Sequence, residues 1–86
     1  MKTIYKYEVL HYNTPTLLPD GAKILYVGEQ DSRIYIWALV NADISVKTPR
    51  SIMAYGTGHQ MDDAERVFIG TVQMANGLVF HFFEEL

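Results

Sequence analysis

The hydrophobic pattern of the chain is that of a β protein, with short apolar stretches separated by turn-forming residues. Residues 33–41 (RIYIWALVN) show it best, because β-branched and aromatic side chains recur with a period of two. This alternation places Ile34, Ile36, Ala38 and Val40 on one face and Tyr35, Trp37 and Leu39 on the other. Both faces are apolar, so we expect a central strand that is covered on both sides, or one whose second face meets a partner.

Five further stretches favour strands by the same composition, at residues 2–12, 22–29, 51–55, 67–74 and 78–83. Within 22–29, strict alternation predicts Lys23, Leu25 and Val27 on one face and Ile24 and Tyr26 on the other. Gly70, inside 67–74, indicates a bulge or a close approach of another backbone.

The segments between these stretches contain recognisable turn chemistry. Pro19-Asp20-Gly21 and Asn76-Gly77 carry residues that tolerate turn conformations, and Gln30-Asp31-Ser32 is short and polar. We treat residues 42–50 as an exposed connection, and residues 61–66 as able to form one helical turn.

Six strands with turns about every 8–12 residues predict an all-β fold, either a small antiparallel sandwich or a small barrel, with at most one short helical turn. A chain of 86 residues forms a single domain spanning 1–86. Because 49% of the residues are hydrophobic and 13% aromatic, we expect a ring-rich interior, with Tyr26 and Trp37 in core or interface packing.

Charge and composition exclude several classes of function. The net charge is −3 and the seven lysines and arginines are scattered, so we expect no binding to duplex nucleic acid. The chain has no cysteine, which excludes disulfides and thiolate chemistry. It shows no apolar run long enough for a membrane span and no signal-peptide pattern near its start, so we place it in the cytoplasm.

The loop that follows residues 51–55 is the best candidate site. In Tyr55-Gly56-Thr57-Gly58-His59, alternating glycines can turn successive backbone N–H groups inward as an anion-binding nest, to which Thr57 and His59 can add donors. The Tyr55 ring could stack on a base while Arg33, Arg50 or Arg66 clamps a phosphate. The alternative is a tight connection in which the glycines only relieve backbone strain.

Other chemistry finds little support in the sequence. His11, His59 and His81 with Asp62 and Asp63 do not form a recognisable set of three metal ligands, so we expect no metal. No serine lies in a nucleophile-elbow motif, so we expect no catalytic residue, no enzyme activity and no cofactor.

Four segments carry a family resemblance: 24–41 (ILYVGEQDSRIYIWALVN), 53–59 (MAYGTGH), 68–73 (FIGTVQ) and 78–85 (LVFHFFEE). They resemble a family of small phage- and prophage-encoded proteins of unknown function, with WALV and IYGTGH-like motifs. The chain departs from that pattern at Gln60, where the family has proline. The resemblance implies a phage accessory protein acting in a host cell, such as a counter-defence factor, and it brings no known site residues.

We therefore expect a binding protein that sequesters a small phosphate-bearing ligand derived from a nucleotide, without catalysis. The alternative is a homo-oligomeric protein–protein interaction module that blocks a host factor. A homo-oligomer is expected in either case, because a single sheet with two apolar faces has few other elements to cover it.

Overall fold

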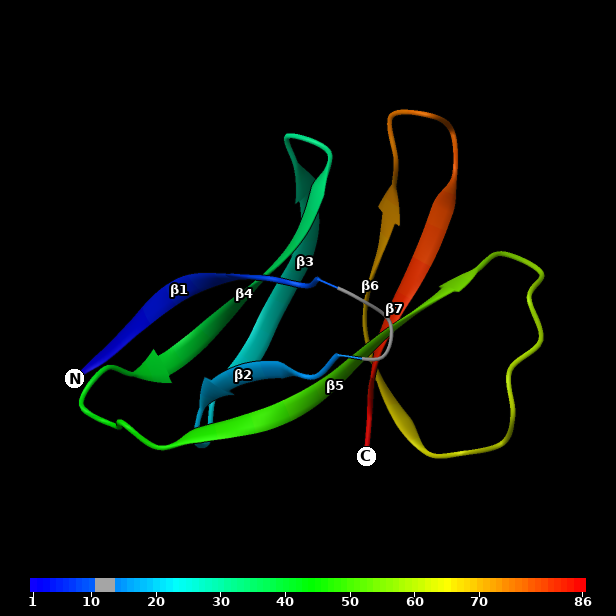
Figure 1. Ribbon diagram of the computed structural model, residues 1–86. Coiled ribbons are helices and arrows are strands. Elements are labelled where there is room, and N and C mark those ends of the chain that lie inside the picture. The colour runs from blue at the N-terminus through cyan, green and yellow to red at the C-terminus, as the bar shows by residue number, and fades with distance from the viewer. Residues whose placement is uncertain (11–13) are drawn as a thin grey trace.

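The computed structural model describes residues 1–10 and 14–86, which form seven strands and no helix. The strands are β1 (Lys2–Glu8), β2 (Thr16–Pro19), β3 (Lys23–Gln30), β4 (Arg33–Asn41), β5 (Lys47–Gly56), β6 (Arg66–Gln73) and β7 (Val79–Glu85). They make two antiparallel sheets, with strand orders β1-β4-β3 and β2-β5-β7-β6 (Figure 1). The all-β prediction is confirmed, in its two-sheet form.

The prediction of a central strand with two distinct faces is confirmed for β4, which pairs with β1 on one side and β3 on the other. Its inner side chains, Ile36, Ala38 and Val40, are at most 2% exposed. Tyr35, Trp37 and Leu39 lie on the opposite face and are only half-buried. Among the described residues no strand lies over that outer face, so the first of the two arrangements expected, a strand covered on both sides, is not seen. That a partner meets this face stays a prediction.

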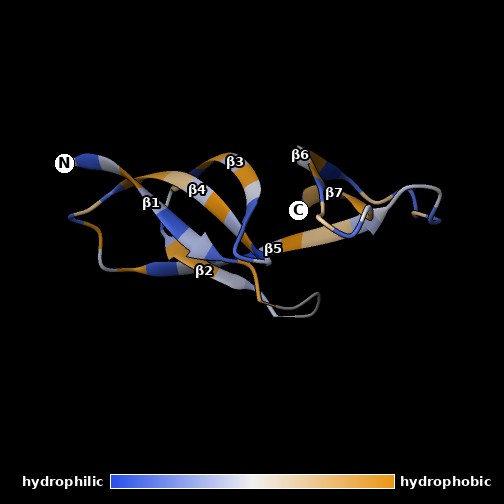
Figure 2. Cartoon of the chain, turned by 90° about the horizontal axis from the view of Figure 1, so that it is seen from above, coloured by the Kyte–Doolittle hydropathy of each residue, from blue (hydrophilic) through white to orange (hydrophobic). Residues whose placement is uncertain are grey.

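Strand β5 is shared between the two halves of the molecule. Its residues 47–50 pair with β2, and its residues 51–56 pair with β7. Figure 2 shows β5 running from beneath the β1-β4-β3 sheet to the side of β6 and β7. The prediction that 42–50 is wholly an exposed connection is therefore wrong from Lys47 onward. Pro49 is tolerated in the strand because its other edge is unpaired before Ser51.

Two other boundaries differ from the predictions. β1 ends at Glu8 rather than continuing to residue 12, and residues 11–13, with the candidate ligand His11, lie outside the described residues. The extended stretch Thr16–Pro19 becomes a seventh strand because β5 offers it a partner. The possible helical turn at 61–66 does not form, and residues 57–65 are an irregular loop.

Bulges decide which side chains share a face. The register of β3 on β4 shifts between Ile24 and Tyr26, so Leu25 is the extra residue. The predicted face assignment for 22–29 is wrong for this reason: Lys23 lies with Tyr26 on the outer face, and Ile24 lies with Val27 on the inner one. The register of β6 on β7 likewise shifts between Phe68 and Gly70, which confirms the bulge predicted there.

The predicted turns are confirmed by their backbone geometry. Gly21 and Gly77 have φ of 77° and 88°, and each lies in a turn closed by a backbone hydrogen bond. The β3–β4 hairpin has a two-residue loop in which Asp31 and Ser32 both have positive φ, as a type I′ turn requires.

The core is aliphatic, not aromatic. Its buried members are Leu18, Ala22, Val27, Ile36, Ala38, Val40, Ile52, Val72 and Phe82. Phe82 is the one buried aromatic side chain among the described residues, whereas Tyr26 is 63% exposed. Tyr7 and Phe80 pack partly buried against this core, and the rings of Tyr26, Tyr35, Trp37, Tyr55, Phe68 and Phe83 lie on outer faces. The expectation of a ring-rich interior is therefore wrong. Within residues 1–10 and 14–86 there is no helix with the length and apolarity needed to cross a membrane.

Candidate functional site

The glycine loop after β5 is a tight turn. The His59 N–H donates to the Gly56 carbonyl at 3.1 Å, and Gly58 between them has φ of 86°. Gly56 still belongs to β5, and a β-carbon added to it would lie 2.7 Å from the His59 ring. The two glycines therefore serve the turn and the packing of His59. The His59 amide is used within the turn, so the loop has the geometry of the tight connection rather than of an open nest.

The structure brings Tyr55 and Arg66 together. The Arg66 guanidinium lies 5.2 Å from the centre of the Tyr55 ring, and the Tyr55 hydroxyl donates to Glu85 at 2.5 Å. This hydrogen bond, with burial, raises the pKa of Tyr55. The two residues therefore meet inside a network that already contains a carboxylate, and the predicted clamping of a phosphate stays a prediction.

Arg66 is held mainly by Asp62. It donates to the Asp62 carbonyl at 2.9 Å and to its carboxylate at 2.5 Å, which raises the pKa of Arg66. The pKa of Asp62 is lowered by the Ala64 amide and by Arg66. The Arg66 side chain is 8% exposed, and its Nε, 3.8 Å from Glu85, has no hydrogen-bond partner among the described residues.

His81 lies between two threonines on the same surface. Its Nε2 is 2.7 Å from the Thr57 hydroxyl and its Nδ1 is 3.0 Å from the Thr71 hydroxyl. Both ring nitrogens are therefore occupied by neutral partners. Across residues 1–10 and 14–86, no three histidine or carboxylate side chains are grouped so that they could hold a metal ion.

Three aromatic rings form a row across the outer face of β5, β7 and β6. The Phe83 ring lies 5.3 Å from Phe68 and 5.8 Å from Tyr55, edge-on to each. Phe68 is 57% exposed. We call this surface the Tyr55 face; it comprises Met53, Tyr55, Arg66, Phe68, Thr71, His81, Phe83 and Glu85, which the strand registers place on one side.

The charges around the loop are unfavourable for a phosphate. Asp62, Asp63 and Glu65 lie in the loop 57–65, which contains no lysine or arginine. Arg66, at the loop's end, is already neutralised by Asp62. A phosphate here would meet three carboxylates and one committed cation, which is the reverse of a usual anion site.

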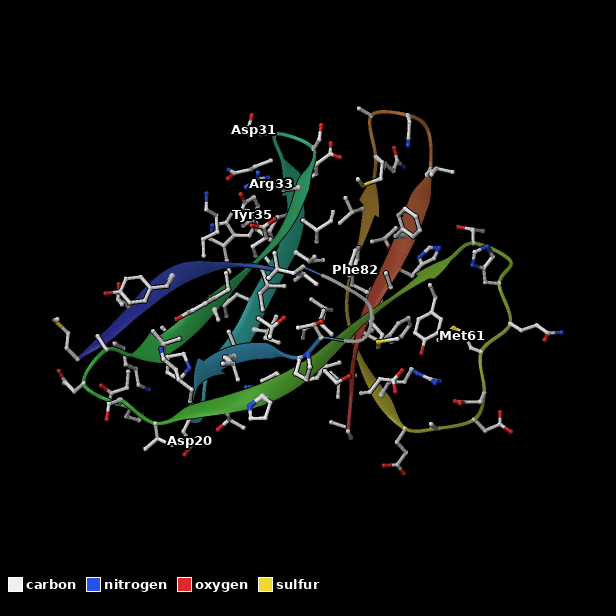
Figure 3. The ribbon with its side chains drawn as sticks, viewed as in Figure 1. Asp20, Asp31, Arg33, Tyr35, Met61 and Phe82 are labelled. Atoms are coloured by element: carbon white, nitrogen blue, oxygen red, sulfur yellow. The ribbon has the colours of Figure 1, made fainter. Side chains whose placement is uncertain are left out.

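The other two predicted arginines lie elsewhere. Arg50 forms a two-pronged ion pair with Glu84 and donates to the Ala22 carbonyl at 2.8 Å, so its pKa is raised. Arg33 lies on the β3–β4 hairpin, 3.8 Å from Glu8, and its side chain is 64% exposed. Figure 3 shows Arg33 beside Tyr35, far from Met61 of the loop. The structure thus brings Arg66 to Tyr55, at the start of the glycine loop, and engages Arg50 and Arg33 with Glu84 and Glu8 instead.

A second aromatic surface covers the outer side of the β1-β4-β3 sheet. The Trp37 ring lies 5.7 Å from Tyr26 and 6.3 Å from Tyr35. We call this surface the Trp37 face; the registers place on it Lys2, Ile4, Lys6, Glu8, Lys23, Tyr26, Gly28, Gln30, Arg33, Tyr35, Trp37, Leu39 and Asn41. The sequence pattern gave its β4 residues, but the bulge at Leu25 hid the contribution of Tyr26.

Gly28 lies beneath a ring of the Trp37 face. A β-carbon on Gly28 would be 2.9 Å from the Tyr26 ring and in ordinary contact with the Trp37 ring at 3.6 Å, so the glycine lets the Tyr26 ring lie over this position. The Lys6 amine lies 4.5 Å from the centre of the Tyr35 ring and donates to Gln30 at 2.9 Å. The Lys6 side chain thereby reaches from β1 across β4 to β3 and holds a positive charge over the Trp37 face.

A cavity of about 210 Å³ opens between the two sheets. Its walls are apolar and consist of Val9, Leu10, Ile34, Ile52, Ala54, Met74, Phe80 and Phe82. None of the described residues that line it is charged, so these walls lack the polar groups that fix a ligand's orientation.

Comparison with known proteins gives a family and no activity. A family model matches residues 1–86, and its description is "Domain of unknown function (DUF7352)". No curated protein and no solved structure matches the chain.

Proposed function

The chain belongs to the DUF7352 family, and we propose that it is a non-catalytic binding module whose Trp37 face docks on an acidic surface of a protein partner. The observation that carries the proposal is the exposure of the rings. In a chain with an aliphatic core, Tyr26, Tyr35 and Trp37 gather on an uncovered sheet face, and Tyr26 is 63% exposed. Tyrosine and tryptophan are the residues that most often dominate the energy of protein interfaces.

The backbone beneath these rings favours tight association. β4 is hydrogen-bonded on both sides, and the Trp37 ring lies within 6.3 Å of the Tyr26 and Tyr35 rings. The backbone is thus already ordered before a partner binds, which lowers one of the main costs of association.

The charge on the Trp37 face indicates the chemistry of the partner. Lys2, Lys6, Lys23 and Arg33 lie on it with one carboxylate, Glu8. The rest of the chain has three basic residues and nine acidic ones. A partner with an acidic rim would be attracted to this face and repelled by the remainder, which gives both speed and orientation to the encounter.

A protein surface suits the Trp37 face better than a small ligand does. Sites for small molecules are concave and enclose most of the ligand, whereas this face is the outer side of a three-stranded sheet. Ile4 is 53% exposed on it, an apolar group with no use for a phosphate. The nucleotide-derived ligand expected from the sequence is thus the weaker hypothesis. The resemblance to phage-encoded proteins supports a host protein as the partner and a counter-defence role as the setting.

The test is comparative capture from bacterial lysate with wild type, Tyr26→Asp and Val46→Asp. Tyr26 and Val46 are 63% and 64% exposed, so the two substitutions introduce the same charge at equally accessible positions. We expect one protein to be captured by wild type and by Val46→Asp but not by Tyr26→Asp. Its affinity, measured with the purified pair, should fall as salt rises.

Two results would oppose the proposal. One is that no protein distinguishes Tyr26→Asp from Val46→Asp while both variants remain folded. The other is that a nucleotide, in a thermal-shift screen, stabilises the protein by the amount expected of a specific ligand, about 2.7 kcal/mol at one hundred times its dissociation constant. That second result would restore the nucleotide-binding hypothesis.

A further inference from the structure

We infer that the Tyr55 face is the contact surface for a second copy of this chain, in a two-fold symmetric dimer centred on Phe68. Phe68 is 57% exposed although its ring packs edge-on against Phe83. A large ring this exposed, in a row with two others on an uncovered face, is typical of the centre of an interface.

Most polar groups of this face, apart from the Arg66 Nε, are already paired with one another or with the loop that follows β5. The Tyr55 hydroxyl donates to Glu85, and the Thr57 and Thr71 hydroxyls contact His81. Removing such groups from water leaves few hydrogen bonds broken, so covering the face costs less than covering free donors and acceptors would.

Charge decides between this face and the Trp37 face as the self-association surface. In a two-fold dimer each face meets a copy of itself. Two Trp37 faces would bring together two sets of four cations with one carboxylate each, which repel. On the Tyr55 face the strand residues carry one cation and one carboxylate, Arg66 and Glu85, 3.8 Å apart within one copy, so this strand surface has no net charge to repel a second copy.

The chain exposes more surface than a monomer of its mass is expected to, by about the area that one partner buries in an interface. The accessible surface is 5868 Å² for a mass of 9.8 kDa. A monomer of this mass is expected to expose about 5,200 Å², so the excess is about 700 Å². Each partner in a standard interface buries about 800 Å². A second copy is also a partner that is always present. Oligomerisation is one of the ways in which a small domain compensates for a small core.

The dimer would change how the module binds. Each copy leaves its Trp37 face free, because that face belongs to the other sheet. The assembly would then present two equivalent binding faces, and a partner with repeated sites would gain affinity by avidity.

The experiment is sedimentation equilibrium of wild type, Phe68→Lys and Leu17→Lys. Phe68 and Leu17 are 57% and 58% exposed. Leu17 lies on the same side of the sheet but outside the Tyr55 face, since it pairs with Pro49, six residues before Tyr55 along β5. We expect a wild-type dimer at micromolar concentration, an unchanged Leu17→Lys dimer, and a dissociation constant for Phe68→Lys raised on the order of 30-fold or more. A monomeric wild type, or a Phe68→Lys protein that dimerises as well as wild type, overturns the inference.

A second measurement covers the case in which Phe68→Lys does not fold. In a mixed sample of isotope-labelled and unlabelled wild type, isotope-filtered NMR should detect contacts between copies from the Phe68 ring. Contacts between copies from the Trp37 ring instead would place the dimer on the wrong face and overturn the assignment.

Discussion

Gly70 of β6 lies directly against Val27 of β3, and this contact joins the two sheets. A β-carbon on Gly70 would lie 2.9 Å from the Val27 Cγ1 atom. Both strands lie at the end of their sheets in the strand order, and Val27 is 2% exposed. The absence of a side chain at Gly70 is therefore what lets the edges of the two sheets approach across the core.

Gly70→Ala should lower the free energy of unfolding by about 1–3 kcal/mol, because the added methyl overpacks the core at Val27. Urea denaturation measures this loss. In a double-mutant cycle with Val27→Ala, the two losses should not add, since shortening Val27 makes room for the methyl. Gln73→Ala, at an exposed position of the same strand, should change the value by less than about 0.5 kcal/mol.

Arg50 should prove to be a structural residue. Its guanidinium joins β5 to β7 through Glu84 and reaches the Ala22 carbonyl, with the ion-pair side chains 20% and 15% exposed. Arg50→Lys cannot keep this forked geometry, so we expect a loss of about 1–3 kcal/mol in unfolding free energy. Arg33→Lys, at an exposed site, should lose less than about 0.5 kcal/mol. Equal losses in the two variants would contradict this division of roles.

The β3–β4 hairpin should be open to stabilisation. Asp31 and Ser32 have φ of 52° and 66°, and serine is strained in that region while glycine is not. Ser32→Gly should therefore raise the free energy of unfolding by about 0.5–1 kcal/mol, measured in urea. Ser45→Gly, in the connection before β5, serves as control and should give no gain. A loss at Ser32→Gly would show that the turn is not under strain.

The sequence predicted the strands well and their boundaries and faces less well. Alternation in 33–41 identified the central strand, and the Pro-Asp-Gly and Asn-Gly turns were placed by chemistry that acts within a few residues. The strand Thr16–Pro19 was missed because it depends on β5, a partner about thirty residues away. The faces of β3 were misassigned because the bulge at Leu25 is set by pairing with β4.

The candidate site was predictable only where it depends on residues close together in the sequence. Tyr55 and the turn 56–59 are local features, and the sequence located them. Arg50 is held by Glu84, a tertiary contact that composition could not reveal. Arg66 is held by Asp62, four residues earlier, but in an irregular loop, for which no regular spacing predicts the pair. The location of the rings outside the core likewise depends on how the sheets pack.

The wild-type protein should lose more stability at alkaline pH than the Tyr55→Phe variant does. The hydrogen bond to Glu85 raises the pKa of Tyr55 above its ordinary value of 10.0. Because the pKa of Tyr55 is higher in the folded state, its contribution to the free energy of unfolding is complete below about pH 10. That contribution is lost as the pH rises through the folded-state pKa. At about pH 8, Tyr55→Phe should be less stable by about 1–2 kcal/mol in urea, and at about pH 11 the difference should shrink. Tyr7, whose pKa burial raises, is present in both proteins and cancels from the comparison. A difference that stays constant with pH would show that the Tyr55–Glu85 bond contributes nothing.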